Sequence, residues 1–207
     1  FVENDSNCTI VQSTISHHPN TAITICDAEL IILESKIKHN AGNGILAIQQ
    51  ATVQADLCEF KDNKMPHIAG KEQTSLTVLN SIFEGGKSIY LLEQSHAHIT
   101  ASSFTNGDGV QIEITDETKL TLNNCRIDHG KSNAVKASMN STLNIYDSQI
   151  ANHRLPQVVI NDSSLIFNNS ELIDGERNGF IIENYSEAFI QDSFITKHQY
   201  PQIWIDK

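Results

Sequence analysis

Apolar and polar residues alternate along this chain in a pattern that returns about every 22 residues. Its most regular element is a tripeptide with a small first residue and a large apolar third residue, which we call the anchor. The nine anchors are Ile15, Ile37, Phe60, Phe83, Phe104, Ile127, Ile150, Leu172 and Ile195. Successive anchors are 22, 23, 23, 21, 23, 23, 22 and 23 residues apart. A fixed period of this length indicates a solenoid in which each repeat forms one coil.

Two alternating segments accompany each anchor and predict strands. Apolar residues stand seven and five positions before it, as Leu30 and Ile32 do before Ile37. A second apolar pair follows a polar turn, as at Ile45 and Ala47. Side chains two residues apart share one face of a strand, so each coil has three inward apolar segments. Stacked coils bury these segments and pair each strand with its copies, which predicts a parallel β-solenoid.

Over essentially the whole chain, these repeats resemble the right-handed parallel β-helix repeats of the pectin-lyase-like superfamily. The sequence fits hexapeptide and leucine-rich solenoids less well, because it has neither a six-residue repeat nor a Leu-x-x-Leu-x-Leu run. We therefore expect an all-β, right-handed parallel β-helix of about nine coils, forming a single domain over residues 1–207. Neither end of the sequence supplies a cap for a terminal coil, so we expect the chain to be a fragment of a longer protein.

Two finer patterns overlie this period. The residue two positions before the anchor is Ser or Cys in all nine coils, which predicts a stack of small side chains inside a bend. Turns after alternate anchors carry proline, whereas the intervening turns are rich in Gly and Asn. Pro66 and Pro156 are 90 residues apart and Pro156 and Pro201 are 45 apart, so we expect the coils to be organised in pairs.

The charge balance excludes several partners. Fourteen Lys and Arg against 25 Asp and Glu give a net charge of −11, and nucleic-acid binding depends on a basic surface. The longest apolar runs, such as Leu30 to Leu33, are far shorter than the roughly 20 residues that cross a membrane as a helix. We therefore expect neither a nucleic-acid nor a membrane partner.

The four cysteines are expected to be free thiols. Cys58 and Cys125 share one inward column but lie three coils apart, which is beyond disulfide reach. Cys8 and Cys26 fall in or beside other inward columns. Free thiols favour a reducing compartment, so we expect a cytoplasmic protein. No Cys-x-x-Cys pair or Cys/His cluster appears, so we expect no metal and no cofactor.

One turn edge gathers residues suited to acid/base chemistry. These residues follow the anchors of neighbouring coils and are Asp108, Asp128, His129, His153, Arg154 and Asp174, with Arg177 beside the last. The family resemblance implies clustered Asp residues with a His in a hydrolase, or calcium-binding carboxylates with an Arg or Lys base in a lyase. Asp128-His129-Gly130 is similar to the His-Gly element of polygalacturonases, although the paired Asp and Arg-x-Lys elements are missing. A solvated polar edge is the plainer interpretation, and a pH-responsive or metal-binding histidine edge is a third.

Outward positions in the C-terminal third break the polar pattern. Val159, Ile181 and Trp204 lie between inward residues of one strand column, and Ile166 and Phe189 lie in another. Contiguous exposed apolar residues usually mark a contact surface. We expect these five residues to form one row that binds a protein partner or a second copy of the chain.

Three functions remain open at this point. The leading hypothesis is a non-catalytic β-helical scaffold or recognition module that binds protein, with polysaccharide as a further candidate ligand. The first alternative is a carbohydrate-active hydrolase or lyase with its site on the edge from Asp108 to Arg177. The second is a regulatory domain attached to an AAA-type ATPase, because the alternating coils resemble β-helix regions of larger bacterial proteins.

Overall fold

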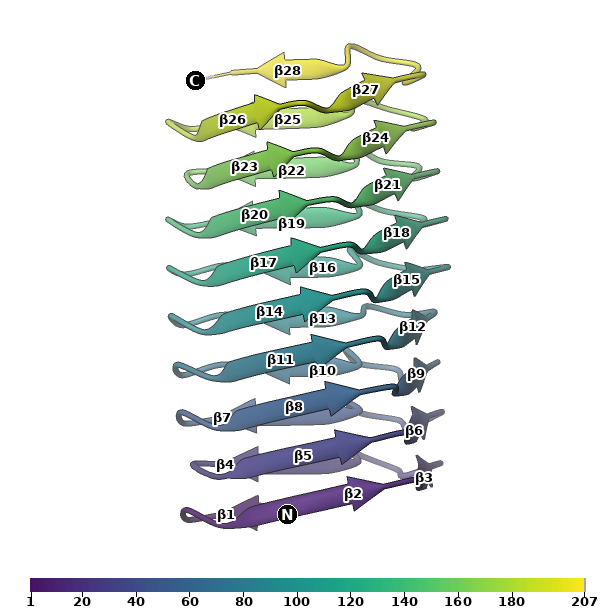
Figure 1. Cartoon of the computed structure of the whole chain (residues 1–207), viewed down its shortest axis with the longest axis vertical. Helices are drawn as coiled ribbons and strands as arrows, with labels where there is room; N and C mark the ends of the chain where they lie inside the picture. Colours follow the sequence, from purple (N-terminus) through teal and green to yellow (C-terminus); the bar gives the residue numbers. More distant parts are fainter. Residues whose placement is uncertain (207) are drawn as a thin grey trace.

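The computed structural model describes residues 1–206, which form strands joined by short turns. Three parallel sheets, here called A, B and C, run the length of the molecule, and each coil adds one strand to each sheet. Successive coils stack in sequence order, so the two ends of the chain lie at opposite ends of the stack (Figure 1). The prediction of an all-β parallel solenoid of about nine coils is confirmed.

The strands of each sheet are equivalent segments of successive coils. Sheet A contains β1 (Val2–Glu3), β4 (Ile23–Cys26), β7 (Ile45–Ile48), β10 (Ile68–Gly70), β13 (Ile89–Leu91), β16 (Ile112–Ile114), β19 (Val135–Ser138), β22 (Val158–Asn161), β25 (Phe180–Glu183) and β28 (Ile203–Ile205). Sheet B contains β2 (Asn7–Val11), β5 (Glu29–Leu33), β8 (Thr52–Asp56), β11 (Ser75–Leu79), β14 (His96–Thr100), β17 (Lys119–Asn123), β20 (Thr142–Tyr146), β23 (Ser164–Asn168) and β26 (Glu187–Gln191). Sheet C contains β3 (Thr14–Ser16), β6 (Lys36–Lys38), β9 (Glu59–Lys61), β12 (Ile82–Glu84), β15 (Ser103–Thr105), β18 (Arg126–Asp128), β21 (Gln149–Ala151), β24 (Glu171–Ile173) and β27 (Phe194–Thr196).

The register of the strands follows the sequence repeat. Every anchor lies in sheet C directly opposite the anchor of the next coil, as Phe83 lies opposite Phe60 and Phe104. The turn after Phe83 is two residues shorter than its neighbours, yet Ile89 still pairs with Ile68. The turn therefore absorbs the deletion, and the inward columns stay aligned.

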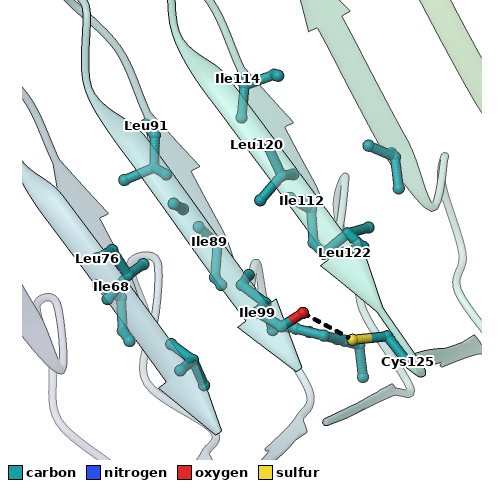
Figure 2. Packing of buried hydrophobic residues seen from close by; sticks show 14 of the residues in the cluster. Ile68, Leu76, Ile89, Leu91, Ile99, Ile112, Ile114, Leu120, Leu122 and Cys125 are labelled. Atoms are coloured by element: carbon teal, nitrogen blue, oxygen red, sulfur yellow. Dashed lines mark hydrogen bonds between the residues drawn. The ribbon is translucent and has the colours of Figure 1, made fainter. Parts of the chain in front are cut away.

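The core fills the space between the three sheets. Sheet A lies behind sheet B in Figure 1, and sheet C closes one side. Inward side chains of β13, β14, β16 and β17 meet in this space, as the close view in Figure 2 shows. Phe60, Phe83 and Phe104 form a stack along sheet C, with ring centroids 4.7 and 4.6 Å apart. Burying side chains of this size contributes about 1.5–3 kcal/mol each, which is why isolated coils would not fold.

Left-handed backbone turns explain the composition of the edges. The second residue before each sheet C strand has a φ near +50°, as Asn124 has at 51°. The residue directly after nearly all of these strands has a similar φ, as His129 has at 53°. Asn, Asp and His adopt this conformation more readily than other non-glycine residues. The crowding of His, Asp and Asn directly after the anchors is therefore a backbone requirement as well as a source of polar groups.

A ladder of small polar side chains lines the bend between sheets B and C. The Ser81 hydroxyl accepts a hydrogen bond from the Cys58 amide at 3.1 Å and donates one to the Leu79 carbonyl at 2.6 Å. Cys125 occupies the same column, and its thiol donates to the Ile99 carbonyl at 3.5 Å (Figure 2). All four cysteines are free, as expected. Burial raises the pKa of the Cys58 and Cys125 thiols, so both stay protonated.

Contacts between histidine and glutamine side chains explain why the coils are organised in pairs. His153, three residues after its anchor, reaches over Gly130 of the preceding coil and donates from Nε2 to Gln111 Oε1, two coils away, at 2.6 Å. His198 repeats this contact over Gly175, with Nε2 3.0 Å from Gln157 Oε1. The coil that lies between the histidine and its glutamine partner must carry glycine at the third position after its anchor. A Cβ at Gly130 would lie 2.4 Å from His153 Cδ2.

The alternating prolines belong to the same two-coil unit. The Asn43 side chain donates to the Pro66 carbonyl of the next coil at 3.2 Å, and the Asn178 side chain donates to the Pro201 carbonyl at 3.0 Å. Each pair joins an Asn-bearing turn to a Pro-bearing turn. The contacts bear out the expected pairing of coils.

Candidate functional site

Asp128 forms the centre of the most elaborate polar cluster on the turn edge. It ends β18 and points away from the core, yet only 3% of the residue is exposed. Arg126 donates to Asp128 Oδ2 from Nη2 at 2.7 Å and from Nε at 3.2 Å. His129 Nδ1 and Asn152 Nδ2 each lie 2.8 Å from Oδ1. The carboxylate is therefore enclosed by its own coil and the next one.

These contacts fix the charge state of the cluster. Burial raises the pKa of Asp128, but the hydrogen bonds from Arg126 and Asn152 and the nearby His129 outweigh it, so the pKa lies below its ordinary value. Asp128 is thus ionised at neutral pH, and its Oδ1 lies 2.8 Å from His129 Nδ1. The His129 side chain is 63% exposed. An exposed imidazole beside a carboxylate is a candidate for general acid/base chemistry.

His153 does not join this site, which corrects the expected position of its side chain. The residue is fully buried and bonded to Gln111, because the third position after the anchor points inward over Gly130. Burial lowers its pKa to about 4, so the imidazole is neutral near pH 7. We therefore assign His153 to the packing between coils.

The remaining candidates of the edge are exposed and lie apart from Asp128. Lys131 Nζ lies 2.6 Å from Asp108 Oδ1, and Lys197 Nζ lies 4.0 Å from Asp174 Oδ1. Arg154 is exposed, and the Arg177 guanidinium lies 4.8 Å from the centre of the Tyr200 ring. Asp108 and Asp174 therefore each lie beside a lysine of the following coil.

A hollow on the same edge, in the N-terminal half, was not singled out from the sequence. It has a volume of about 820 Å³, and His17, His39 and Asp62 line it together with Lys64. The short turn that contains Gly86 forms one wall. The sequence signals were the crowded histidines and the two-residue deletion, but only the structure places them together.

The expected apolar row divides between two faces. Val159, Ile181 and Trp204 lie on sheet A, whereas Ile166 and Phe189 lie on sheet B. Since the two sheets face each other across the core, their outward side chains point in opposite directions (Figure 1). Trp204 is 51% exposed and Phe189 57% exposed, while the other three are half-buried. The expectation of one continuous row is therefore wrong in its geometry.

Two further properties concern the described part of the chain. Within residues 1–206, no three His, Cys, Asp or Glu side chains lie so that they could hold a metal ion. The same residues contain no helix that is long and apolar enough to cross a membrane.

Three parallel sheets, a continuous core and polar edges define a parallel β-helix. The profile of the right handed beta helix region family matches residues 1–150 and 67–207, which together cover the whole sequence. The chain therefore belongs to the right-handed β-helix family.

Several solved structures are similar to this chain. A family 28 exopolygalacturonase from Yersinia enterocolitica is 12% identical with a TM-score of 0.45, and the match covers 90% of this chain and 47% of that one. The surface protein and adhesin PfbA of Streptococcus pneumoniae is 8% identical with a TM-score of 0.24, over 93% of this chain and 91% of that one. The fluoroquinolone resistance protein QnrB1 is 10% identical with a TM-score of 0.24, over 98% and 92%. The chain thus spans about half the length of the exopolygalacturonase. No curated protein matches the sequence.

Proposed function

We propose that this β-helix is a non-catalytic scaffold and recognition domain that binds a protein partner along its side, with polysaccharide as a further candidate ligand. The observation that carries the proposal is the separation of the acid/base groups. Asp128 is enclosed, His153 is buried, and Asp108 lies beside Lys131. A hydrolytic or eliminative site needs at least two such groups around one reacting atom.

One exposed and two half-buried apolar side chains supply a surface for a partner. Trp204, Ile181 and Val159 follow one another on adjacent strands of sheet A, in register. Aromatic residues at the centre of an interface often carry much of its binding energy. The partner that is tested most simply is a second copy of the chain.

Static light scattering over a range of concentrations tests the self-association form of this proposal. We expect the wild-type mass to rise above that of one chain, and the double variant Ile181→Ser/Trp204→Ser to remain at the mass of one chain. The matched control is Ile166→Ser/Phe189→Ser, which alters the opposite face and should associate like the wild type. A single-chain mass for all three proteins would contradict self-association, and equal losses in both double variants would contradict the assignment to sheet A.

One observation favours the enzymatic alternative. His129 Nδ1 lies 2.8 Å from the Asp128 carboxylate and the His129 side chain is 63% exposed, so its imidazole is accessible to a polysaccharide substrate as a general base must be. In this alternative, Asp128 positions His129 and His129 accepts the proton. A cleavage assay with variants of these two residues separates the two functions.

A further inference from the structure

One large apolar side chain interrupts a polar column at the bend between sheets B and C. The column contains the residue three positions before each anchor, and every member has a φ between 46° and 54°. The members are Gln12, Glu34, Leu57, Asn80, Ala101, Asn124, Asp147, Asn169 and Asp192. Leucine adopts this left-handed conformation less readily than Asn or Asp, yet Leu57 has a φ of 54° and is 57% exposed. The stability of the fold therefore does not explain why this position carries leucine.

Leu57 belongs to an exposed apolar patch. Leu79 ends β11 in the next coil, and its carbonyl accepts a hydrogen bond from the Leu57 amide at 3.3 Å. Ile82 begins β12, on the other side of the bend in the same coil as Leu79. The side chains of Leu79 and Ile82 are both exposed. Neighbouring exposed apolar residues of this kind usually mark a contact surface.

A groove continues from this patch along the bend. It has a volume of about 580 Å³ and is lined from Ile82 to Glu171. Ala101 and Ser103 belong to its lining, and their short side chains leave it open. From Glu34, on the other side of the patch, to Glu171 the bend crosses six coil spacings, which is about 29 Å. We call this surface, from Glu34 to Glu171, the corner surface.

Four carboxylates lie along the corner surface, two toward each end. Each accepts a hydrogen bond from an amide side chain of an adjacent coil, which orients the carboxylate without neutralising its charge. The pairs are Gln12 with Glu34 at 2.9 Å, Asn80 with Asp56 at 2.9 Å, Asn169 with Asp147, and Gln149 with Glu171 at 2.7 Å. Arg126 also lines the groove, but its guanidinium is bound to Asp128 at 2.7 Å. The surface is therefore complementary to a ligand that is apolar near one end and basic at both.

We propose that the corner surface binds an extended basic segment of a protein partner. An apolar side chain of the segment contacts Leu57, Leu79 and Ile82, and Lys or Arg residues at its two ends meet the two pairs of carboxylates. An extended chain advances about 3.3 Å per residue, so about ten residues span this surface. The inference rests on the protein-binding function proposed above, names the chemistry of the partner, and places it on a surface separate from the apolar row of sheet A.

Fluorescence anisotropy with a labelled ten-residue peptide tests the proposal on the full chain. The peptide carries two Lys, two Leu, four Ser and two Lys, in this order. We expect saturable binding with a micromolar dissociation constant at about 50 mM salt, and weaker binding at about 300 mM salt, because salt screens exposed charges. A second peptide with Ser in place of both Leu should bind at least about fivefold more weakly.

Leu57→Asn is the decisive variant, because it removes the apolar side chain and introduces a residue that favours the left-handed backbone. We expect it to bind the peptide at least about fivefold more weakly, while its thermal unfolding midpoint rises by about 2–4 °C. Ile82→Ser should weaken binding by about threefold to fivefold. The matched control is Leu155→Asn, which removes an exposed leucine from the turn between sheets C and A and should leave the affinity unchanged.

Charge-neutral variants separate the corner surface from the general acidity of the chain. Glu34→Gln/Asp147→Asn should weaken binding by about threefold to tenfold and reduce its dependence on salt. Glu93→Gln/Asp116→Asn removes two acidic groups from the turns between sheets A and B and should do neither.

Several results would overturn the inference. They are the absence of saturable binding, wild-type affinity or a lower unfolding midpoint in Leu57→Asn, and an equal loss of affinity in either control variant. Light scattering reports on the sheet A surface and anisotropy reports on the corner surface. A chain that self-associates but does not bind the peptide therefore refutes this inference alone.

Discussion

The packing of His153 over Gly130 predicts that a single methyl group added at residue 130 destabilises the protein. In Gly130→Ala the new Cβ would lie 2.4 Å from His153 Cδ2, 2.8 Å from His153 Nε2 and 3.2 Å from Gln111 Oε1. His153 is fully buried and cannot move into solvent without opening the coil. The methyl group must therefore displace the imidazole and break its 2.6 Å hydrogen bond to Gln111.

The expected loss of stability combines three terms. Overpacking of a dense core costs about 1–3 kcal/mol. A buried hydrogen-bonding group without its partner costs about 1–3 kcal/mol more. Replacing glycine with alanine lowers the entropy of the unfolded chain and returns about 0.4–1 kcal/mol. The free energy of unfolding of Gly130→Ala should therefore fall by about 1–5.5 kcal/mol.

Chemical unfolding followed by circular dichroism measures this loss, and a double-mutant cycle identifies its cause. In a His153→Ala background the space over residue 130 is open, so Gly130→Ala should cost less than about 1 kcal/mol. Gly109→Ala is the matched control, because no atom lies within 4 Å of a Cβ at Gly109. If Gly130→Ala is as stable as the wild type, or costs the same in both backgrounds, the two-coil packing is refuted.

Three further predictions concern the core, the buried imidazole and the thiols. Phe83→Ala should lower the free energy of unfolding by about 3–5 kcal/mol, because the ring lies between two stacked neighbours, whereas Phe194→Ala, 70% exposed, should cost less than about 0.5 kcal/mol in the same assay. Burial holds the pKa of His153 at about 4, against about 6.5 for an unfolded chain, so the unfolded state binds the proton first as pH falls. Stability should therefore drop by about 3 kcal/mol between about pH 6.5 and pH 4, and His153→Gln should flatten this slope in urea unfolding at several pH values. Cys58 and Cys125 should react with a thiol reagent only as fast as the chain unfolds, since both are buried and free, and rapid labelling of all four cysteines in the native state would contradict this packing.

The repeat was predictable because inward side chains must recur at the same place in each coil. The anchors found in the sequence, from Ile15 to Ile195, lie opposite one another in sheet C, and no strand is shifted out of this register. The spacing of 21 residues between Phe83 and Phe104 comes from a turn two residues shorter than its neighbours, since the strand phase on either side is unchanged. Periodicity therefore reports strands, register and the inward face.

Periodicity does not show to which side of the molecule an outward strand face points, or which side chains a turn buries. Ile166 and Ile181 are both outward, but they point to opposite faces because sheets A and B lie on opposite sides of the core. The sequence places His153 among turn residues, which predicts an exposed side chain. Its hydrogen-bond partner Gln111 is 42 residues away in the sequence, so the buried contact could not be predicted from the local pattern. The spacing of Pro66, Pro156 and Pro201 was the sequence signal of the two-coil unit.

The central claim that the turn edge is not a catalytic site is tested most directly by a cleavage assay. Polygalacturonate and other plant and bacterial polysaccharides are incubated with the wild type, Asp128→Asn and His129→Ala, and new reducing ends and unsaturated products are measured. The account predicts no product above the buffer control for any of the three proteins. Product formed by the wild type and lost in both variants would contradict it and would establish His129 as a general base that Asp128 positions.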